Sequence, residues 1–316
     1  MPTTVDSEGF RCGYVGLVGR PNAGKSTLLN RLLGAKLAIT SAKPQTTRNR
    51  VAGIHTDERM QAVLVDTPGV HSGWTELNKE MVGCAYGVLA EVDLVCWVMD
   101  VNVLQERISR TGECLGEAER ELAARIDKSG AQLVVAVNKL DTIATPDVLP
   151  VLEHIGRELS PRAAVPISAK DGVSCDLLLE AFFEGLPLGA PLYPEDEWAQ
   201  VTERFMVAEL IREQLFLRLD QELPYATFVD VIQFDESKRD ANGLVRIFAD
   251  ILVERSSQKG IVIGKGGQML KSIGSAARKE LQPLLDARVY LELRVKVVPD
   301  WSRSVRGLRR VGFRAS

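Results

Sequence analysis

The chain of 316 residues lacks the features that mark membrane-spanning, secreted and zinc-binding proteins. No apolar run approaches the roughly 18 residues that a spanning helix requires. The first ten residues, MPTTVDSEGF, contain acids and no apolar run, so we expect neither a secretory signal nor a transit peptide. The five cysteines form no C-x-x-C pair, which argues against zinc or redox chemistry and predicts reduced thiols. These absences predict a cytoplasmic protein.

The composition is that of a soluble globular chain, with 45% hydrophobic and 26% charged residues, and its length suits two domains. Charge differs between the halves. Residues 1–199 hold 19 basic and 27 acidic residues, whereas residues 200–316 hold 20 and 15. Residues 255–316 alone hold 14 basic and 4 acidic residues, a net charge of +10. Such a basic segment on an acidic protein indicates a polyanion partner.

Short apolar runs alternate with helical patterns in residues 1–187, which predicts an α/β domain with a doubly wound, mostly parallel sheet. The predicted strands are residues 14–19, 60–66, 93–100, 132–138 and 163–168. Prolines and acids interrupt the pattern, so residues 188–200 are predicted to be a linker.

Residues 201–316 are predicted to form a second, α+β domain. A helix is expected over 202–219 with Thr202 as its cap, and another near 267–285. The predicted strands are residues 226–234, 244–253 and 288–297.

The segment GRPNAGKS (19–26) fits the phosphate-binding pattern G-x-x-x-x-G-K-[ST] and lies between a strand and a helix. Backbone N–H groups from Asn22 to Ser26 would surround the β-phosphate, and Lys25 would reach the β- and γ-phosphates. Ser26 would bind Mg²⁺. The predicted nucleotide-binding residues here are Gly19, Asn22, Ala23, Gly24, Lys25, Ser26 and Thr27.

Two later motifs select guanine. In NKLD (138–141), the Asp141 carboxylate can accept hydrogen bonds from guanine N1–H and the 2-amino group, which adenine cannot offer. Lys139 would lie along the base, Asn138 would brace neighbouring loops, and the backbone N–H of Ala169 would meet guanine O6. The motif SAK adds Ser168, Ala169 and Lys170 to the predicted site, whose ligands are GTP and GDP.

The segment VDTPG (65–69) follows a strand and predicts the metal and γ-phosphate side of the site. Asp66 would hold Mg²⁺ through water, and the Gly69 N–H would contact the γ-phosphate. In KPQTTRNR (43–50), either Thr46 or Thr47 would complete the Mg²⁺ shell. The predicted catalytic residues are Lys25, Thr46, Thr47, Asp66 and Gly69, and the predicted metal ligands are Ser26, Thr46, Thr47 and Asp66.

Val70 stands where Ras-like enzymes place a water-orienting glutamine, so we expect slow intrinsic hydrolysis. Asn22 resembles the pattern of GTPases that hold a potassium ion beside the phosphates. We therefore expect hydrolysis to be stimulated by potassium.

The pattern G-x-x-G occurs three times, and only GKGG (264–267) lies outside the first strand and phosphate loop. Apolar residues 261–263 precede it, lysines flank it, and a helical pattern follows. In a KH fold such a loop approaches the backbone of single-stranded RNA, beside an apolar groove that residues 261–263 would line. The predicted RNA-binding residues are Lys259, Ile261, Ile263, Gly264, Lys265, Gly266, Gly267 and Lys271. The alternative is a plain helix–turn–helix connection on a basic surface.

The order of these motifs closely resembles the Era family of bacterial GTPases with a C-terminal, type II KH domain, over residues 11–313. ITSAKPQTTR, VDTPGVH, ELPYA and ILVERSSQKGIVIGKGGQMLKSIGSAAR carry the resemblance. It implies GTP hydrolysis, binding of single-stranded RNA near the 3′ end of 16S ribosomal RNA, a role in small (30S) subunit assembly, and peripheral association with the inner membrane. Ala23 departs from the valine or threonine common in the family, and TTRNR departs from TTRH. We expect a monomer.

We interpret the chain as a GTP-gated RNA binder. One alternative is a non-catalytic GTP-gated RNA-binding module, in which Val70 marks lost turnover. Another is a membrane-associated cell-cycle switch, whose basic tail meets anionic lipid.

Overall fold

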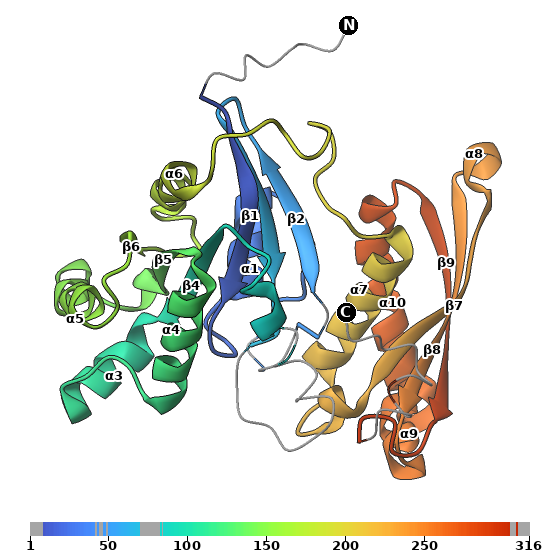
Figure 1. Ribbon diagram of the computed structural model, residues 1–316. Coiled ribbons are helices and arrows are strands. Elements are labelled where there is room, and N and C mark those ends of the chain that lie inside the picture. Colours follow the sequence, from blue (N-terminus) through green and yellow to red (C-terminus); the bar gives the residue numbers. More distant parts are fainter. Residues whose placement is uncertain are drawn as a thin grey trace, which may run out of the picture. The chain divides into compact units, whose positions relative to one another are not determined.

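The computed structural model describes residues 9–41, 43, 47–48, 50–69, 83, 85–303 and 308, which form two compact units (Figure 1). Unit 1 holds the described residues up to 38, from 47 to 69 and from 83 to 200. Unit 2 holds residues 39–41 and 43 together with the described residues from 201 onward. A short segment before Thr47 therefore belongs to the second unit, which the sequence did not predict.

Unit 1 is built on a six-stranded sheet with the strand order β2-β3-β1-β4-β5-β6. β2 runs antiparallel to β3, and every other neighbouring pair is parallel. The mostly parallel sheet confirms the predicted α/β class, and all five predicted strands are present, whereas β2 was not predicted. The strands are β1 (Arg11–Val18), β2 (Val51–Thr56), β3 (Met60–Asp66), β4 (Leu94–Asp100), β5 (Gln132–Asn138) and β6 (Ala163–Pro166).

The chain builds β2 and β3 on one side of β1 and then crosses to β4 on the other side. Ligands of open parallel sheets bind beyond the carboxyl ends of the strands at such a reversal of strand order. The phosphate loop follows β1, residues 67–69 follow β3, and the NKLD motif begins at the end of β5. The topology thus brings all the guanine-nucleotide motifs to one edge of the sheet.

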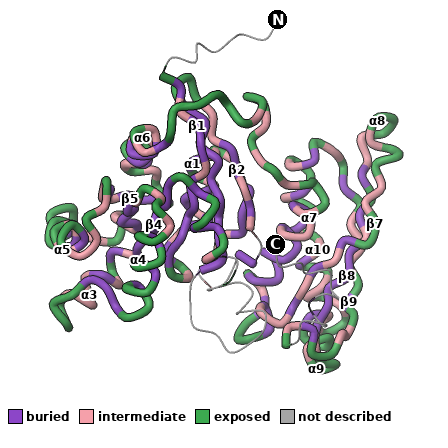
Figure 2. The backbone as a smooth tube through the Cα atoms, in the orientation of Figure 1, coloured by how far each residue is buried: buried purple, intermediate pink, exposed green. Residues whose placement is uncertain are grey.

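Helices pack on both faces of the sheet because the strand side chains that point to each face are apolar. Val95, Trp97 and Met99 share a core with side chains of α3, α4 and α5, and on the other face a Cβ added at Gly185 of α6 would come within 2.5 Å of Leu94. Figure 2 shows β4 buried along its length and α5 largely exposed. The helices are α1 (Lys25–Leu33), α3 (Val101–Thr111), α4 (Glu117–Ser129), α5 (Leu149–Leu159) and α6 (Cys175–Gly185).

Residues 188–200, the predicted linker, lie along the edge of unit 1. Leu188 forms an isolated antiparallel bridge with Arg11, and Ala199 forms another with Gly53 of β2. The segment is therefore held to unit 1 at both of its ends.

Gln61 of β3 holds the middle of this segment and is fully buried. Its side-chain oxygen accepts the N–H groups of Leu192 (2.8 Å) and Tyr193 (2.9 Å), and its amide nitrogen donates to the carbonyl oxygen of Tyr193 (2.9 Å). One side chain thus makes three hydrogen bonds to the backbone of the segment.

We expect Gln61→Ala to lower the free energy of unfolding by about 1–3 kcal/mol, because it leaves these backbone groups without partners. Urea unfolding would measure this. Gln132→Ala is the control, since Gln132 lies on β5 with an exposed side chain. Equal stability of the two variants would contradict the assigned role of Gln61.

Unit 2 consists of a three-stranded sheet, ordered β7-β8-β9, with helices α7, α9 and α10 packed on it. β8 is antiparallel to β7 and parallel to β9. The side-chain oxygen of Thr202 accepts the N–H of Phe205 at 3.2 Å, which confirms the predicted cap. The elements are α7 (Glu203–Arg218), β7 (Phe228–Lys238), the short α8 (Arg239–Asn242), β8 (Leu244–Val253), α9 (Ser256–Ile263), α10 (Gln268–Leu284) and β9 (Arg288–Val297).

Four of the cysteines lie among the described residues. Cys12, Cys96, Cys114 and Cys175 are free and buried, and burial raises the pKa of each thiol. Within the described ranges, none of the helices combines the length and the apolar character that crossing a membrane would require.

Candidate functional site

The phosphate loop, residues 19–26, connects β1 to α1 and depends on two glycines. A Cβ at Gly19 would lie 2.3 Å from the carbonyl oxygen of Val98, and one at Gly24 would lie 2.1 Å from Asn138 Nδ2. Both glycines also have positive φ, 147° and 99°. Larger residues at either position would separate the loop from the neighbouring strand ends.

Lys25 is buried at the start of α1, and its ammonium lies inside the loop. Nζ donates to the carbonyl oxygens of Gly19 and Arg20, both at 3.1 Å. Burial lowers the pKa of Lys25 to about 8, against the opposing attraction of Asp66. The chain thus holds a buried cation at the place where the motif predicts phosphates.

Three oxygen-bearing side chains meet beside Lys25. Ser26 Oγ donates to Asp66 Oδ2 (2.7 Å), Thr47 Oγ1 donates to the same oxygen (3.0 Å), and the two hydroxyl oxygens lie 2.8 Å apart. Thr46 lies outside the described residues. All three described side chains are buried, which places them where bulk water cannot compete.

This cluster fits Mg²⁺, which prefers oxygen ligands. Asp66 Oδ1 is buried and has no hydrogen-bond partner among the described residues. Burial raises the pKa of Asp66, while Lys25 and the hydroxyls of Ser26 and Thr47 lower it. A cation would compensate the buried carboxylate, and Thr47, one of the two candidate threonines, lies in this cluster.

Gly69 closes the site on the side of β3. A Cβ on this residue would lie 2.7 Å from the backbone nitrogen of Pro21, so only glycine lets the chain after β3 lie directly against the phosphate loop. Val70 lies outside the described residues. The close approach brings the predicted γ-phosphate donor to the phosphate loop.

Asn138 joins the phosphate loop to the SAK loop. Its Nδ2 donates to the carbonyl oxygen of Ala23 (2.8 Å), and its Oδ1 accepts the N–H of Ala169 (3.0 Å). This is the bracing position expected from the sequence. The sequence assigned the N–H of Ala169 to guanine O6. In a nucleotide complex this N–H would therefore either bond to both Asn138 and guanine or lose its hydrogen bond to Asn138.

Asp141, the predicted guanine acceptor, is exposed beside the SAK loop. Its Oδ1 accepts the hydroxyl proton of buried Ser168 at 2.7 Å, which orients the carboxylate. Ser168 also accepts the N–H of Asp171 at 3.1 Å. The SAK loop and the NKLD motif are thus joined by a hydrogen bond that fixes the predicted guanine acceptor.

Two further residues support the base site and were missed by sequence reasoning. Asp100 Oδ2 accepts from Lys139 Nζ at 2.6 Å, and Arg31 donates to the carbonyl oxygens of Ala169 (3.2 Å) and Lys170. The role of Asp100 could have been found from the sequence, because this residue ends the predicted strand 93–100 and NKLD begins at the end of the next one. No feature of the sequence indicates the role of Arg31.

The remaining predicted residues of the phosphate loop have distinct environments. Asn22 is exposed with a left-handed φ of 63°, whereas the side chain of Ala23 is buried. Thr27 is half-buried within α1. The smaller side chain at Ala23 is therefore accommodated inside the fold.

In unit 2 the GKGG loop separates α9 from α10, and three of its residues have positive φ. A Cβ at Gly264 (φ 73°) would lie 2.7 Å from Met269 Cβ, whereas Gly266 (φ 59°) and Gly267 (φ 78°) have open space within 4 Å. Gly264 therefore serves packing. Gly266 and Gly267 leave an accessible surface, and the flanking Lys259, Lys265 and Lys271 are exposed.

The predicted apolar groove needs one correction. Ile261 is 57% exposed and Ile263 is half-buried, but Val262 is fully buried in the core of unit 2. Successive helical residues point about 100° apart, so three in a row cannot line one groove. Val262 is a core residue.

Comparisons with known proteins agree with this geometry. A family described as 50S ribosome-binding GTPase matches residues 14–139, and the KH domain family matches residues 222–302. The first match includes the phosphate loop and Asp66, and the second includes the GKGG loop. The predicted order, a GTPase domain followed by a KH domain, is confirmed.

Curated relatives match the chain over nearly its whole length. GTPase Era of Geobacter metallireducens is 46% identical over 304 residues, covering 96% of this chain and 98% of the relative. GTPase Era of Pseudomonas aeruginosa is 44% identical over 307 residues, covering 96% of both. GTPase Era of Ruminiclostridium cellulolyticum is 38% identical over 307 residues, covering 97% of this chain and 99% of the relative.

Two solved structures are equally similar in fold. An Era variant from Aquifex aeolicus bound to GDP·AlF4⁻ gives a TM-score of 0.88 at 36% identity. Era in complex with MgGDPNP and nucleotides 1506–1542 of 16S ribosomal RNA gives a TM-score of 0.88 at 37% identity. Each comparison covers 96% of this chain and 99% of the other.

Proposed function

The chain belongs to the Era family of GTPases, and from this premise we propose that it is a GTP-controlled RNA-binding switch in small ribosomal subunit assembly. As a member of that family it binds GTP and hydrolyses it to GDP and phosphate. The observation that carries the proposal is the presence, in one chain, of a guanine-nucleotide site and an open glycine loop of the KH type.

The nucleotide half of the proposal uses the chain's own groups. The loop N–H groups and Lys25 would bind the phosphates, Asp141 would select guanine, and the Gly69 N–H would contact the γ-phosphate. Mg²⁺, held by Ser26, Thr47 and Asp66, would neutralise phosphate charge. Because Val70 cannot orient water, the basal rate is expected to be slow.

The RNA half draws on the GKGG loop and on one relative. That relative, 37% identical over nearly the whole chain, was solved with nucleotides 1506–1542 of 16S ribosomal RNA. In this chain Gly266 and Gly267 leave open space, and exposed lysines surround them. We therefore assign the single-stranded 3′ region of 16S ribosomal RNA, within the 30S subunit, as the ligand of unit 2.

Gating is supported by the segment that leads to Thr47. In unit 2, Lys43 Nζ donates to the carbonyl oxygens of Phe216 (2.8 Å) and Leu219 at the end of α7. These are carbonyls that a helix end leaves without intrahelical partners. Four residues later the chain places Thr47 in the predicted metal cluster of unit 1. A nucleotide that orders Thr47 would thereby act on a segment that also binds α7.

Further parts of the proposal concern conditions and location. A potassium ion beside Asn22 would stimulate hydrolysis, in the place that an arginine finger fills in other GTPases. The chain would act as a monomer in the cytoplasm, with peripheral association at the inner membrane.

The experiment measures affinity for a short RNA that copies the 3′ end of 16S ribosomal RNA, with GDP and with Mg²⁺ and GDPNP. We expect about tenfold different affinities in the two states. Lys43→Met should bring the two values together, whereas Lys128→Met, at an exposed position on α4, should not. Absence of RNA binding in both states would refute the RNA function, and equal wild-type affinities would refute gating. Equal hydrolysis rates in sodium and potassium buffers would remove the potassium site.

A further inference from the structure

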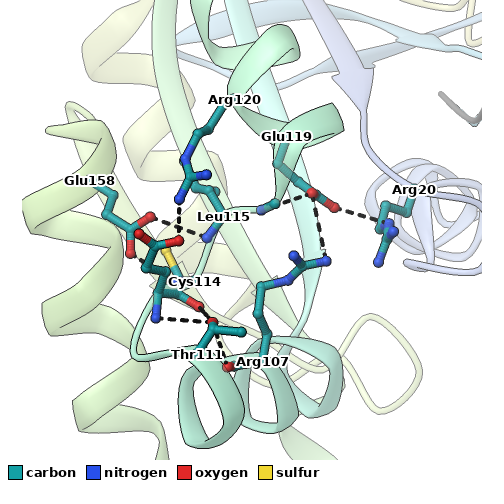
Figure 3. A network of polar contacts seen from close by, with 10 residues as sticks. Arg20, Arg107, Thr111, Cys114, Leu115, Glu119, Arg120 and Glu158 are labelled. Carbon is teal, nitrogen blue, oxygen red and sulfur yellow. Dashed lines mark hydrogen bonds and ion pairs between the residues drawn. The ribbon is translucent and has the colours of Figure 1, made fainter.

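A polar network at the start of α4 reaches the phosphate loop, and its centre is Glu119 (Figure 3). Only 11% of the Glu119 side chain is exposed, and its two carboxylate oxygens contact different partners. Oε1 lies 3.0 Å from Arg20 Nε. Oε2 accepts the N–H of Gly116 at 3.0 Å and lies 3.8 Å from an Arg107 nitrogen.

The bond to Gly116 caps α4 and needs only one carboxylate oxygen. The other oxygen binds Arg20, which lies 99 positions earlier in the chain. A Cβ at Gly116 would come within 2.2 Å of Arg107 and 2.8 Å of Glu119, so both side chains would have to shift to accommodate it. The cap holds the carboxylate rigidly, and Arg20 receives an oriented anion.

Arg20 stands where two parts of the nucleotide site meet. Its carbonyl oxygen accepts from Lys25 Nζ at 3.1 Å. The residue after it, Pro21, provides the backbone against which Gly69 lies, with no room for a Cβ between them. A shift of Arg20 would therefore disturb the support of Gly69, whereas Lys25 would keep its second contact, with the carbonyl oxygen of Gly19.

The ion pair with Glu119 restrains the Arg20 side chain. A cavity of about 340 Å³ lies between the phosphate loop, β4, α3 and α4, and both Arg20 and Glu119 line it. Half of the Arg20 side chain is exposed. Without Glu119, the guanidinium would have open space to move into. Without Arg20, the largely buried Glu119 would lose its nearest counter-charge.

We propose that Glu119 is a positioning residue that holds the phosphate loop, through Arg20 and Pro21, in the geometry that supports Gly69 against the γ-phosphate. The inference depends on the proposed contact between the Gly69 N–H and the γ-phosphate. It predicts selectivity: Glu119 favours GTP over GDP, because only GTP carries the phosphate that Gly69 would contact.

Glu119→Gln tests the proposal, since the amide keeps an oxygen for the Gly116 cap and removes the charge. Affinities for GDP and for GDPNP with Mg²⁺ would be measured with fluorescent nucleotides. We expect GDPNP affinity to fall about fivefold, the scale of an ion pair with one exposed member, and GDP affinity to change less than twofold. Arg20→Ala should give the same change in selectivity, and the double variant should add nothing further.

Glu158→Gln is the matched control. The Glu158 carboxylate accepts the N–H groups of Cys114 (2.7 Å) and Leu115 (3.2 Å) in the same network, and among the described contacts it does not reach Arg20. This variant should lower stability and leave selectivity unchanged. Equal weakening of GDP and GDPNP in Glu119→Gln, or unchanged selectivity, would overturn the inference. Failure of the wild-type chain to bind GDPNP would instead refute the proposed nucleotide site.

Discussion

The Asp141→Asn variant is expected to bind GTP about 100-fold more weakly than the wild-type chain and to prefer xanthosine triphosphate. A carboxylate can accept two hydrogen bonds, one from guanine N1–H and one from the 2-amino group. An amide of the same shape offers one acceptor and one donor, and its NH₂ would face a base donor. Xanthine has a carbonyl oxygen in place of the 2-amino group, so both hydrogen bonds are restored.

The structure supports this prediction because a hydrogen bond orients the Asp141 carboxylate. Ser168 donates to its Oδ1 at 2.7 Å, which restrains the orientation of the carboxylate. Competition of the two nucleotides against fluorescent GDP would measure the change. Asp147→Asn is the control, since Asp147 is an exposed carboxylate on the following turn. An Asp141→Asn variant with unchanged preference for GTP would show that another group reads the base.

Much of the fold could be predicted from periodicity because its cause is local. β8 and β9 have the predicted bounds, residues 244–253 and 288–297, since alternating or continuous apolar residues must face a core. β2 escaped prediction because VAGIHT is short and has Gly53 within it. Its pairing with β3 on one edge and with Ala199 on the other depends on residues distant in the sequence.

The site divides in the same way. The phosphate loop and NKLD are motifs with fixed internal spacing, so the sequence alone predicts which of their residues lie near the ligand. The residues that support the site have no such fixed spacing. Glu119 and Arg20, like Arg31 and Ala169, are about 100 or more positions apart in the chain. In the sequence, a charged residue that supports a loop cannot be distinguished from one that is simply solvated. Val262 shows the reverse error, because a run of apolar residues does not reveal which of them faces the core.

The double variant Gly266→Asp/Gly267→Asp is expected to lose RNA affinity by about 100-fold or more while retaining its fold. Both glycines have positive φ, which aspartate tolerates better than most residues, and a Cβ at either would have no neighbour within 4 Å. The substitutions therefore disturb little packing. They place two negative charges and two side chains where the RNA backbone would approach.

The measurement is GTP turnover and fluorescence anisotropy in potassium buffer, titrated with the 3′-end RNA of the proposal above. Asn242→Asp/Gly243→Asp is a matched control, because Gly243 also has a left-handed φ (59°) and open space, and the charge change is the same. Loss of RNA binding, and of any effect of the RNA on GTP turnover, only in the first variant would locate the contact at the GKGG loop. Equal loss in both would mean that long-range repulsion suffices and that the loop makes no specific contact. Wild-type affinity in the first variant would place the RNA elsewhere, because a backbone clamp cannot tolerate two carboxylates in its opening.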